Sequence, residues 1–161
     1  DSFHARHDAV ARYYIYQIST RRTAMAKNFV WWIKDALDAK AMAEAAKMLI
    51  GMHDFRSFCE TEDGKKQSTK VDVVHADVFT DGDLICFRIG ASHFLWKMVR
   101  RIVGMLAEVG RGNLTFDAFE RLLKFQVETA KFTAPPSGLF LERVLYRGDK
   151  PPENQDAIIS V

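Results

Sequence analysis

The chain has 161 residues, of which 48% are hydrophobic, and its formal net charge is +2. This length supports one hydrophobic core and argues against two full domains. The near-neutral charge excludes a uniformly basic surface, so any contact with nucleic acid has to come from locally clustered Lys and Arg residues. No run reaches the ~18 apolar residues of a membrane span, and we expect no membrane partner.

The first elements along the chain are a strand and a helix. Ala9–Ser19 is rich in aromatic and β-branched residues that alternate, which is typical of a strand. Asp38–Gly51 is rich in alanine and predicts a helix, with Asp38 as its N-cap and Gly51 closing it. The pattern does not fix the conformation of the aromatic stretch between them.

A loop and a hairpin follow. Glu60–Lys70 is charged and lacks apolar residues, so it predicts an exposed loop. Val71–Phe79 and Leu84–Gly90 are β-rich runs on either side of an Asp-Gly pair. Asp-Gly between two such runs is a strong hairpin signal, which predicts two antiparallel strands.

Two helices and a strand complete the predicted order. Helices are predicted over Ser92–Val109 and Thr115–Gln126, a closing strand over Gly138–Tyr146, and a less ordered tail from Gly148. This order predicts an α+β domain in which an antiparallel sheet is covered on one face by helices.

The helix predicted over Ser92–Val109 is apolar around most of its circumference. The residues on the remaining narrow arc are His93, Lys97, Arg100, Arg101, Gly104 and Glu108. A stripe this narrow on an enclosed helix is typical of a cleft, and a partly desolvated Arg100 needs a carboxylate, a phosphate or a base edge as partner. Gly104, one turn later, leaves room beside that arginine. Alternatively, the cations form a solvated edge and Gly104 is a packing contact.

Motifs for other kinds of chemistry are absent from the sequence. The two cysteines, Cys59 and Cys86, have no CxxC spacing, which favours reduced thiols in the cytoplasm. The histidines form no metal-ligand pattern with carboxylates, and the chain has no GxSxG, P-loop or GxGxxG motif. The sequence therefore predicts neither a metal site nor a bound cofactor.

Four blocks carry a family resemblance in the family's own order. They are FHARHDAVARYYIYQI from residue 3, LDAKAMAEAAKMLIGMHDFRSFC from residue 37, FLWKMVRRIVGMLAEVGRG from residue 94 and TAPPSGLFLERVLY from residue 133. Together they resemble the tRNA pseudouridine synthases of the TruA type. The resemblance implies that residues 1–147 are the C-terminal portion of a pseudouridine synthase catalytic domain, followed by a C-terminal tail at 148–161.

The resemblance also implies an activity and partners. Such enzymes are RNA-binding isomerases that convert uridine to pseudouridine in tRNA, without metal or organic cofactor. From the resemblance we expect a cytoplasmic homodimer that acts on the anticodon arm of tRNA.

The resemblance selects two catalytic residues. The family's active-site tyrosine is the first tyrosine of an R-x-Y-x-Y strand, which corresponds to Tyr14. Its active-site arginine is the first one after the Met-Val pair of its helix, which corresponds to Arg100, the same residue that lies at the edge of the polar stripe.

The matched blocks further suggest residues that bind the substrate. Phe94 and Leu139 are candidate walls for a flipped uracil, although each is also an ordinary core residue by pattern. Lys97 and Arg101 are the candidate phosphate contacts, which position RNA without reading its sequence.

One part of the family's site has no counterpart in the sequence. The nucleophilic aspartate belongs to an R-[TA]-D-x-G-V-H-A loop upstream of the first block, and Asp1 does not match it. We therefore expect either the C-terminal portion of a longer enzyme, inactive alone, or a non-catalytic tRNA-binding module.

Overall fold

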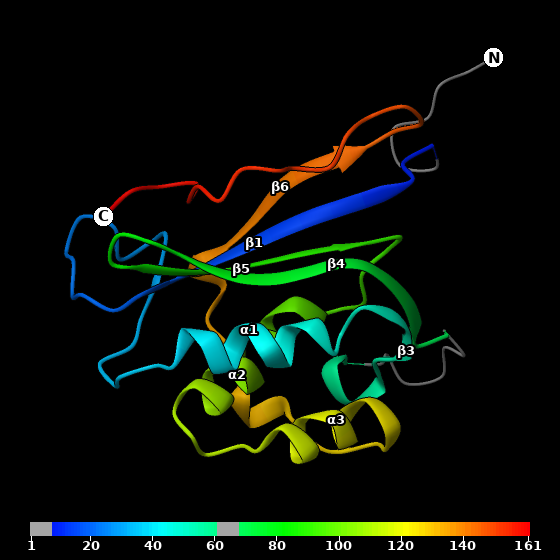
Figure 1. Cartoon of the computed structure of the whole chain (residues 1–161), viewed down its shortest axis with the longest axis horizontal. Coiled ribbons are helices and arrows are strands. Elements are labelled where there is room, and N and C mark those ends of the chain that lie inside the picture. Colours follow the sequence, from blue (N-terminus) through cyan, green and yellow to red (C-terminus); the bar gives the residue numbers. More distant parts are fainter. Residues whose placement is uncertain (1–7, 61–67) are drawn as a thin grey trace.

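A computed structural model describes residues 8–60 and 68–161. In chain order its helices and strands are β1 (Ala11–Ser19), β2 (Trp31–Trp32), α1 (Ala39–Lys47), β3 (Gly51–Asp54), β4 (Lys70–Asp81), β5 (Leu84–Ala91), α2 (Met98–Gly110), α3 (Phe116–Lys124) and β6 (Leu139–Leu145). The strands form one sheet, and the three helices lie together below it (Figure 1). The predicted α+β class, with helices on one face of the sheet, is confirmed.

The sheet is mostly antiparallel and its centre is a long hairpin. The strand order is β2-β1-β5-β4-β3, and β6 pairs with β1. Only the short pairing of β1 with β2 is parallel among the described strands. Asp81 pairs with Leu84, and Gly82 takes a φ of 56° in the turn between them. The Asp-Gly signal thus predicted the hairpin correctly, while most of the predicted loop at Glu60–Lys70 falls outside the described residues.

Helix α1 is capped as predicted but ends early. The Asp38 carboxylate accepts a hydrogen bond from the Ala41 amide at 3.0 Å. The helix stops at Lys47, and Gly51, with a φ of 104°, is the first residue of β3. Gly51 therefore opens a strand and does not close the helix.

Loss of this cap should cost a measurable part of the stability. We expect Asp38→Ala to lower the free energy of unfolding by about 1 kcal/mol, because one amide of the first turn loses its acceptor. Asp38→Asn keeps an acceptor oxygen and should change it by only a few tenths of a kcal/mol. Denaturant unfolding measures both variants, and equal losses would show that the acceptor oxygen of residue 38 does not stabilise the helix.

Helix α2 begins later than predicted. It starts at Met98, and Lys97 before it has a φ of 61°, in the left-handed region. The prediction that the helix begins at Ser92 was wrong, because Phe94 and Leu95 pack against the core from a loop and so continue the apolar pattern. His93 and Lys97 therefore do not belong to a helical stripe.

The C-terminal tail is bound to the sheet on the face opposite the helices (Figure 1). The buried Gln17 side chain accepts a hydrogen bond from the Ile158 amide at 2.6 Å, and the buried Arg88 donates to Asn154 O at 2.5 Å. Residues 148–161 thus form no helix or strand but bond to buried polar side chains of the sheet, and their lower order stays a prediction.

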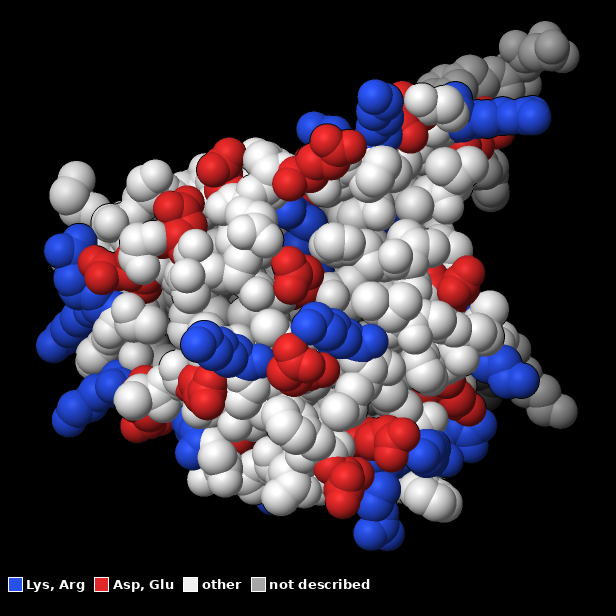
Figure 2. Space-filling view, in the orientation of Figure 1, with Lys and Arg blue, Asp and Glu red and all other residues white. Residues whose placement is uncertain are grey.

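Charges on the surface are mixed. On the face seen in Figure 2, acidic and basic side chains alternate without a continuous basic patch. Any contact with a polyanion on this face would rely on individual cations.

Candidate active site

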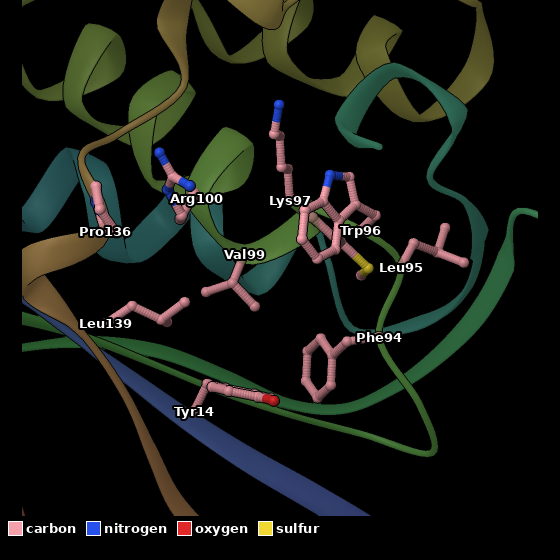
Figure 3. Close-up of a pocket in the computed structure, with 10 residues that line it drawn as sticks. Tyr14, Phe94, Leu95, Trp96, Lys97, Val99, Arg100, Pro136 and Leu139 are labelled. Atoms are coloured by element: carbon pink, nitrogen blue, oxygen red, sulfur yellow. The ribbon is translucent and has the colours of Figure 1, made fainter. Parts of the chain in front are cut away.

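One pocket brings together residues from opposite ends of the chain. It has a volume of about 400 Å³. It is lined by Tyr14, Phe94, Leu95, Trp96, Lys97, Met98, Val99, Arg100, Pro136 and Leu139 (Figure 3). Strand β1, the loop before α2, the first turn of α2, the short 3-10 turn at Pro136–Gly138 and the start of β6 supply these side chains. The lining is mostly apolar and includes no carboxylate from the described part of the chain.

Arg100 is partly buried and held by a backbone carbonyl. Its Nε donates to Ala134 O at 2.6 Å, and its own carbonyl accepts from the Ala134 amide at 3.1 Å. Within residues 8–60 and 68–161, neither Nη nitrogen has a hydrogen-bond partner. The guanidinium is thus fixed on one side and retains donors for a carboxylate or phosphate.

Residues 132–135, which include the Ala134 carbonyl that binds Arg100, are held by two further contacts. The buried Tyr16 hydroxyl donates to Pro135 O at 2.6 Å. Burial raises the pKa of Tyr16 well above its ordinary value, so it stays protonated and can donate. A Cβ on Gly104 would lie 1.5 Å from Phe132 O. Gly104 is therefore a packing contact that admits the backbone of this segment, and does not provide space beside Arg100 as first expected.

Tyr14 forms the opposite wall of the pocket. Its ring packs edge-on against Phe94, with 4.9 Å between the centroids and an angle of 82° between the planes. Its hydroxyl has no hydrogen-bond partner in the part of the chain that the structure describes. Leu139 and Val99 lie between Tyr14 and Arg100 in Figure 3. The pocket thus offers an aromatic surface, an apolar floor and a cation.

The two predicted phosphate contacts both lie near Glu60 but line different cavities. Lys97 lines the pocket and forms an ion pair with Glu60. Arg101 is buried, donates to Cys59 O at 2.7 Å and faces a different hollow. The pocket therefore unites Lys97 with the other candidates and leaves Arg101 outside, and phosphate binding by either stays a prediction.

Sequence reasoning missed Trp96. This side chain is 69% exposed and lines the pocket beside Lys97 (Figure 3). The signal was present in the quoted FLWKMVR block, as a large aromatic residue in a segment rich in cations. The predicted helix obscured it, because Trp96 belongs to a turn.

Other chemistries find little support in the described residues. Both cysteines are buried and free, and burial raises the pKa of the Cys86 thiol to about 12, so at neutral pH it is not a thiolate nucleophile. No group of three His, Cys, Asp or Glu side chains within residues 8–60 and 68–161 is arranged to hold a metal ion. No helix in these ranges is long and apolar enough to cross a membrane.

Comparison with known proteins identifies a family for the chain. Residues 45–147 match the family model described as tRNA pseudouridine synthase. The chain is 41% identical over 149 residues to tRNA pseudouridine synthase A of Brucella anthropi, and 40% identical to that of Brucella ovis. Each alignment covers 91% of this chain and 59% of the relative. The chain thus spans less than two thirds of the length of these relatives.

Proposed function

Because the chain belongs to the tRNA pseudouridine synthase family, we propose that it supplies the tyrosine and arginine half of an active site that isomerises uridine in tRNA. The carboxylate nucleophile comes from a part of the protein outside these 161 residues. The observation that carries the proposal is that Tyr14 and Arg100 line one pocket, each with polar atoms that have no partner in the described chain.

Arg100 keeps the incoming carboxylate charged and aligned. Isomerisation breaks the bond between C1′ and N1 of the uridine, turns the uracil and forms a bond between C1′ and C5, from which a proton leaves. A nucleophile at the sugar has to be ionised, and a guanidinium within hydrogen-bond distance favours the ionised form. The Nε bond to Ala134 O holds the guanidinium at the pocket and leaves both Nη groups available to the carboxylate.

Tyr14 receives the base and takes part in removing the C5 proton. Removing a uridine from its base stack costs a few kcal/mol of free energy, and contacts with an aromatic and apolar pocket offset part of this cost. The ring of Tyr14, with Phe94 and Leu139 beside it, offers such walls. As its hydroxyl accepts the C5 proton it gives up its own, and N1 of the uracil, which carries a proton in pseudouridine, is the group that ends with one.

Removal of the Tyr14 hydroxyl alone should slow turnover. We expect Tyr14→Phe in the full-length protein to lower kcat at least about a hundredfold, because the ring stays and the proton acceptor is lost. Tritium release from C5-labelled uridine in tRNA measures the rate. The matched control is Tyr13→Phe, since Tyr13 is buried on the other face of β1, where Gly90 makes room for its ring. Equal rates in both variants would exclude a chemical role for the Tyr14 hydroxyl.

Membership of the family supports a proposal for the substrate and the assembly. The proposal includes the anticodon arm of tRNA as target, a cytoplasmic homodimer as the working form, and Lys97 at the pocket mouth as a phosphate contact. Mapping of pseudouridine in the product tRNA tests the target, and light scattering tests the dimer. If full-length protein binds tRNA and releases no tritium, the alternative of a non-catalytic tRNA-binding module replaces the proposed activity.

A further inference from the structure

The pocket mouth carries an aromatic surface that the proposed chemistry does not use. We infer that Trp96 stacks on a nucleobase of the RNA, next to the uridine that enters the pocket. This inference rests on the proposed function and adds a binding position to it. The indole lines the pocket, is 69% exposed, and stands beside Phe94 and Lys97 (Figure 3).

A tight turn holds Trp96 outward. The Met98 amide donates to Leu95 O at 3.1 Å, which closes a four-residue turn with Trp96 at its second position. Lys97 at the third position has a φ of 61° and a ψ of 4°, as in a type II turn. Glycine or asparagine is usual at that position, since a left-handed conformation is strained for a residue with a larger side chain. Strain of this kind persists where surrounding contacts impose it, and it is concentrated at functional sites.

Glu60 supplies those contacts. Its amide donates to Trp96 O at 3.2 Å, on the carbonyl that such a turn directs away from its neighbours. Its carboxylate pairs with Lys97 Nζ, and Arg101 Nη2 lies 3.9 Å from the same oxygen. The hydrogen bond and the charge of Lys97 lower the pKa of Glu60, so the carboxylate stays ionised at neutral pH. Glu60 thus binds both the Trp96 carbonyl and the Lys97 side chain of this turn.

The surroundings favour a nucleobase as the occupant. A stacked nucleotide presents an apolar face together with a phosphate, and Trp96 offers an aromatic face next to the Lys97 ammonium, which has donors for a phosphate as well as for Glu60. The surface is continuous with the cavity proposed to receive the uracil, so a neighbouring nucleotide passes over it. Every base has an aromatic face, and the position therefore supports binding without reading sequence.

Kinetics of the full-length enzyme on a tRNA transcript test the inference. Trp96→Ala should raise KM about tenfold and leave kcat within about twofold, because stacking holds the RNA and does not touch the reacting atoms. Trp96→Phe keeps a ring and should recover most of the affinity. Trp32→Ala is the matched control, since Trp32 is 41% exposed and does not line the pocket; its KM should equal that of the wild type.

A fluorescent base reports the contact directly. The transcript carries 2-aminopurine beside the modified uridine, once that uridine is mapped. Binding to the wild type should quench the probe, and Trp96→Ala should remove the quenching. Unchanged KM and quenching in Trp96→Ala would overturn the stacking role. A lower melting temperature of Trp96→Ala with an unchanged KM would also overturn it, and would assign Trp96 to a contact within the full-length protein. Activity that survives Arg100→Ala would instead refute the proposed function.

Discussion

Arg100→Ala in the full-length protein should reduce kcat about a thousandfold, equivalent to about 4 kcal/mol of transition-state stabilisation. The Kd for tRNA should change less than about threefold, because phosphate contacts spread over the RNA supply most of the affinity. In the proposed mechanism the variant loses the cation that keeps the nucleophile ionised, while the pocket walls remain. Tritium release and filter binding on the same preparation measure the two quantities.

One further variant separates the geometry of Arg100 from its charge, and another serves as the control. Arg100→Lys keeps the charge and lacks the planar fork, so we expect it to recover only a small part of the rate. Arg121→Ala is the matched control, because this exposed arginine packs over the Phe125 ring and lies outside the pocket. Wild-type turnover in Arg100→Ala would remove Arg100 from the active site.

Gly104→Ala should destabilise the protein by about 3 kcal/mol, at the upper end of the usual cost of overpacking. The new Cβ would lie 1.5 Å from Phe132 O, and a backbone atom cannot rotate away as a side chain does. The segment that carries Ala134 O would have to move away from α2, which removes the acceptor of Arg100 Nε. We therefore expect a lower kcat as well, measured at a temperature where the variant is folded.

Gly110→Ala provides the comparison on the same helix. Its added Cβ would lie 2.7 Å from the sulfur of Met42, at the flexible end of a side chain that can shift. Denaturant unfolding should therefore show a smaller loss for Gly110→Ala than for Gly104→Ala. Equal losses would mean that the contact with Phe132 has no special cost.

Strands β1, β4, β5 and β6 were predictable because their signals are local, whereas the short strands β2 and β3 were not predicted. The hairpin turn and the alternating strand at Ala11–Ser19 each depend on a few neighbouring residues, and the structure confirms them. The start of α2 was not predictable from pattern, because Phe94 and Leu95 pack on the core from a turn and continue the helical spacing of apolar residues.

The candidate site was predictable only in part. The family blocks and the polar stripe both led to Arg100, and the structure places it in one pocket with Tyr14. Two features depend on long-range packing that no local pattern records. Gly104 lies against a segment about thirty residues later in the chain, and Arg101 is buried and donates to Cys59 O, about forty residues earlier.

A crystal structure of the full-length protein with a tRNA substrate tests the central claim most directly. The account predicts a carboxylate from outside the present 161 residues within hydrogen-bond distance of the Arg100 Nη atoms, about 3 Å, and a uracil against the Tyr14 ring. A uracil bound elsewhere, or Arg100 directed into solvent with no acid near it, would contradict the account.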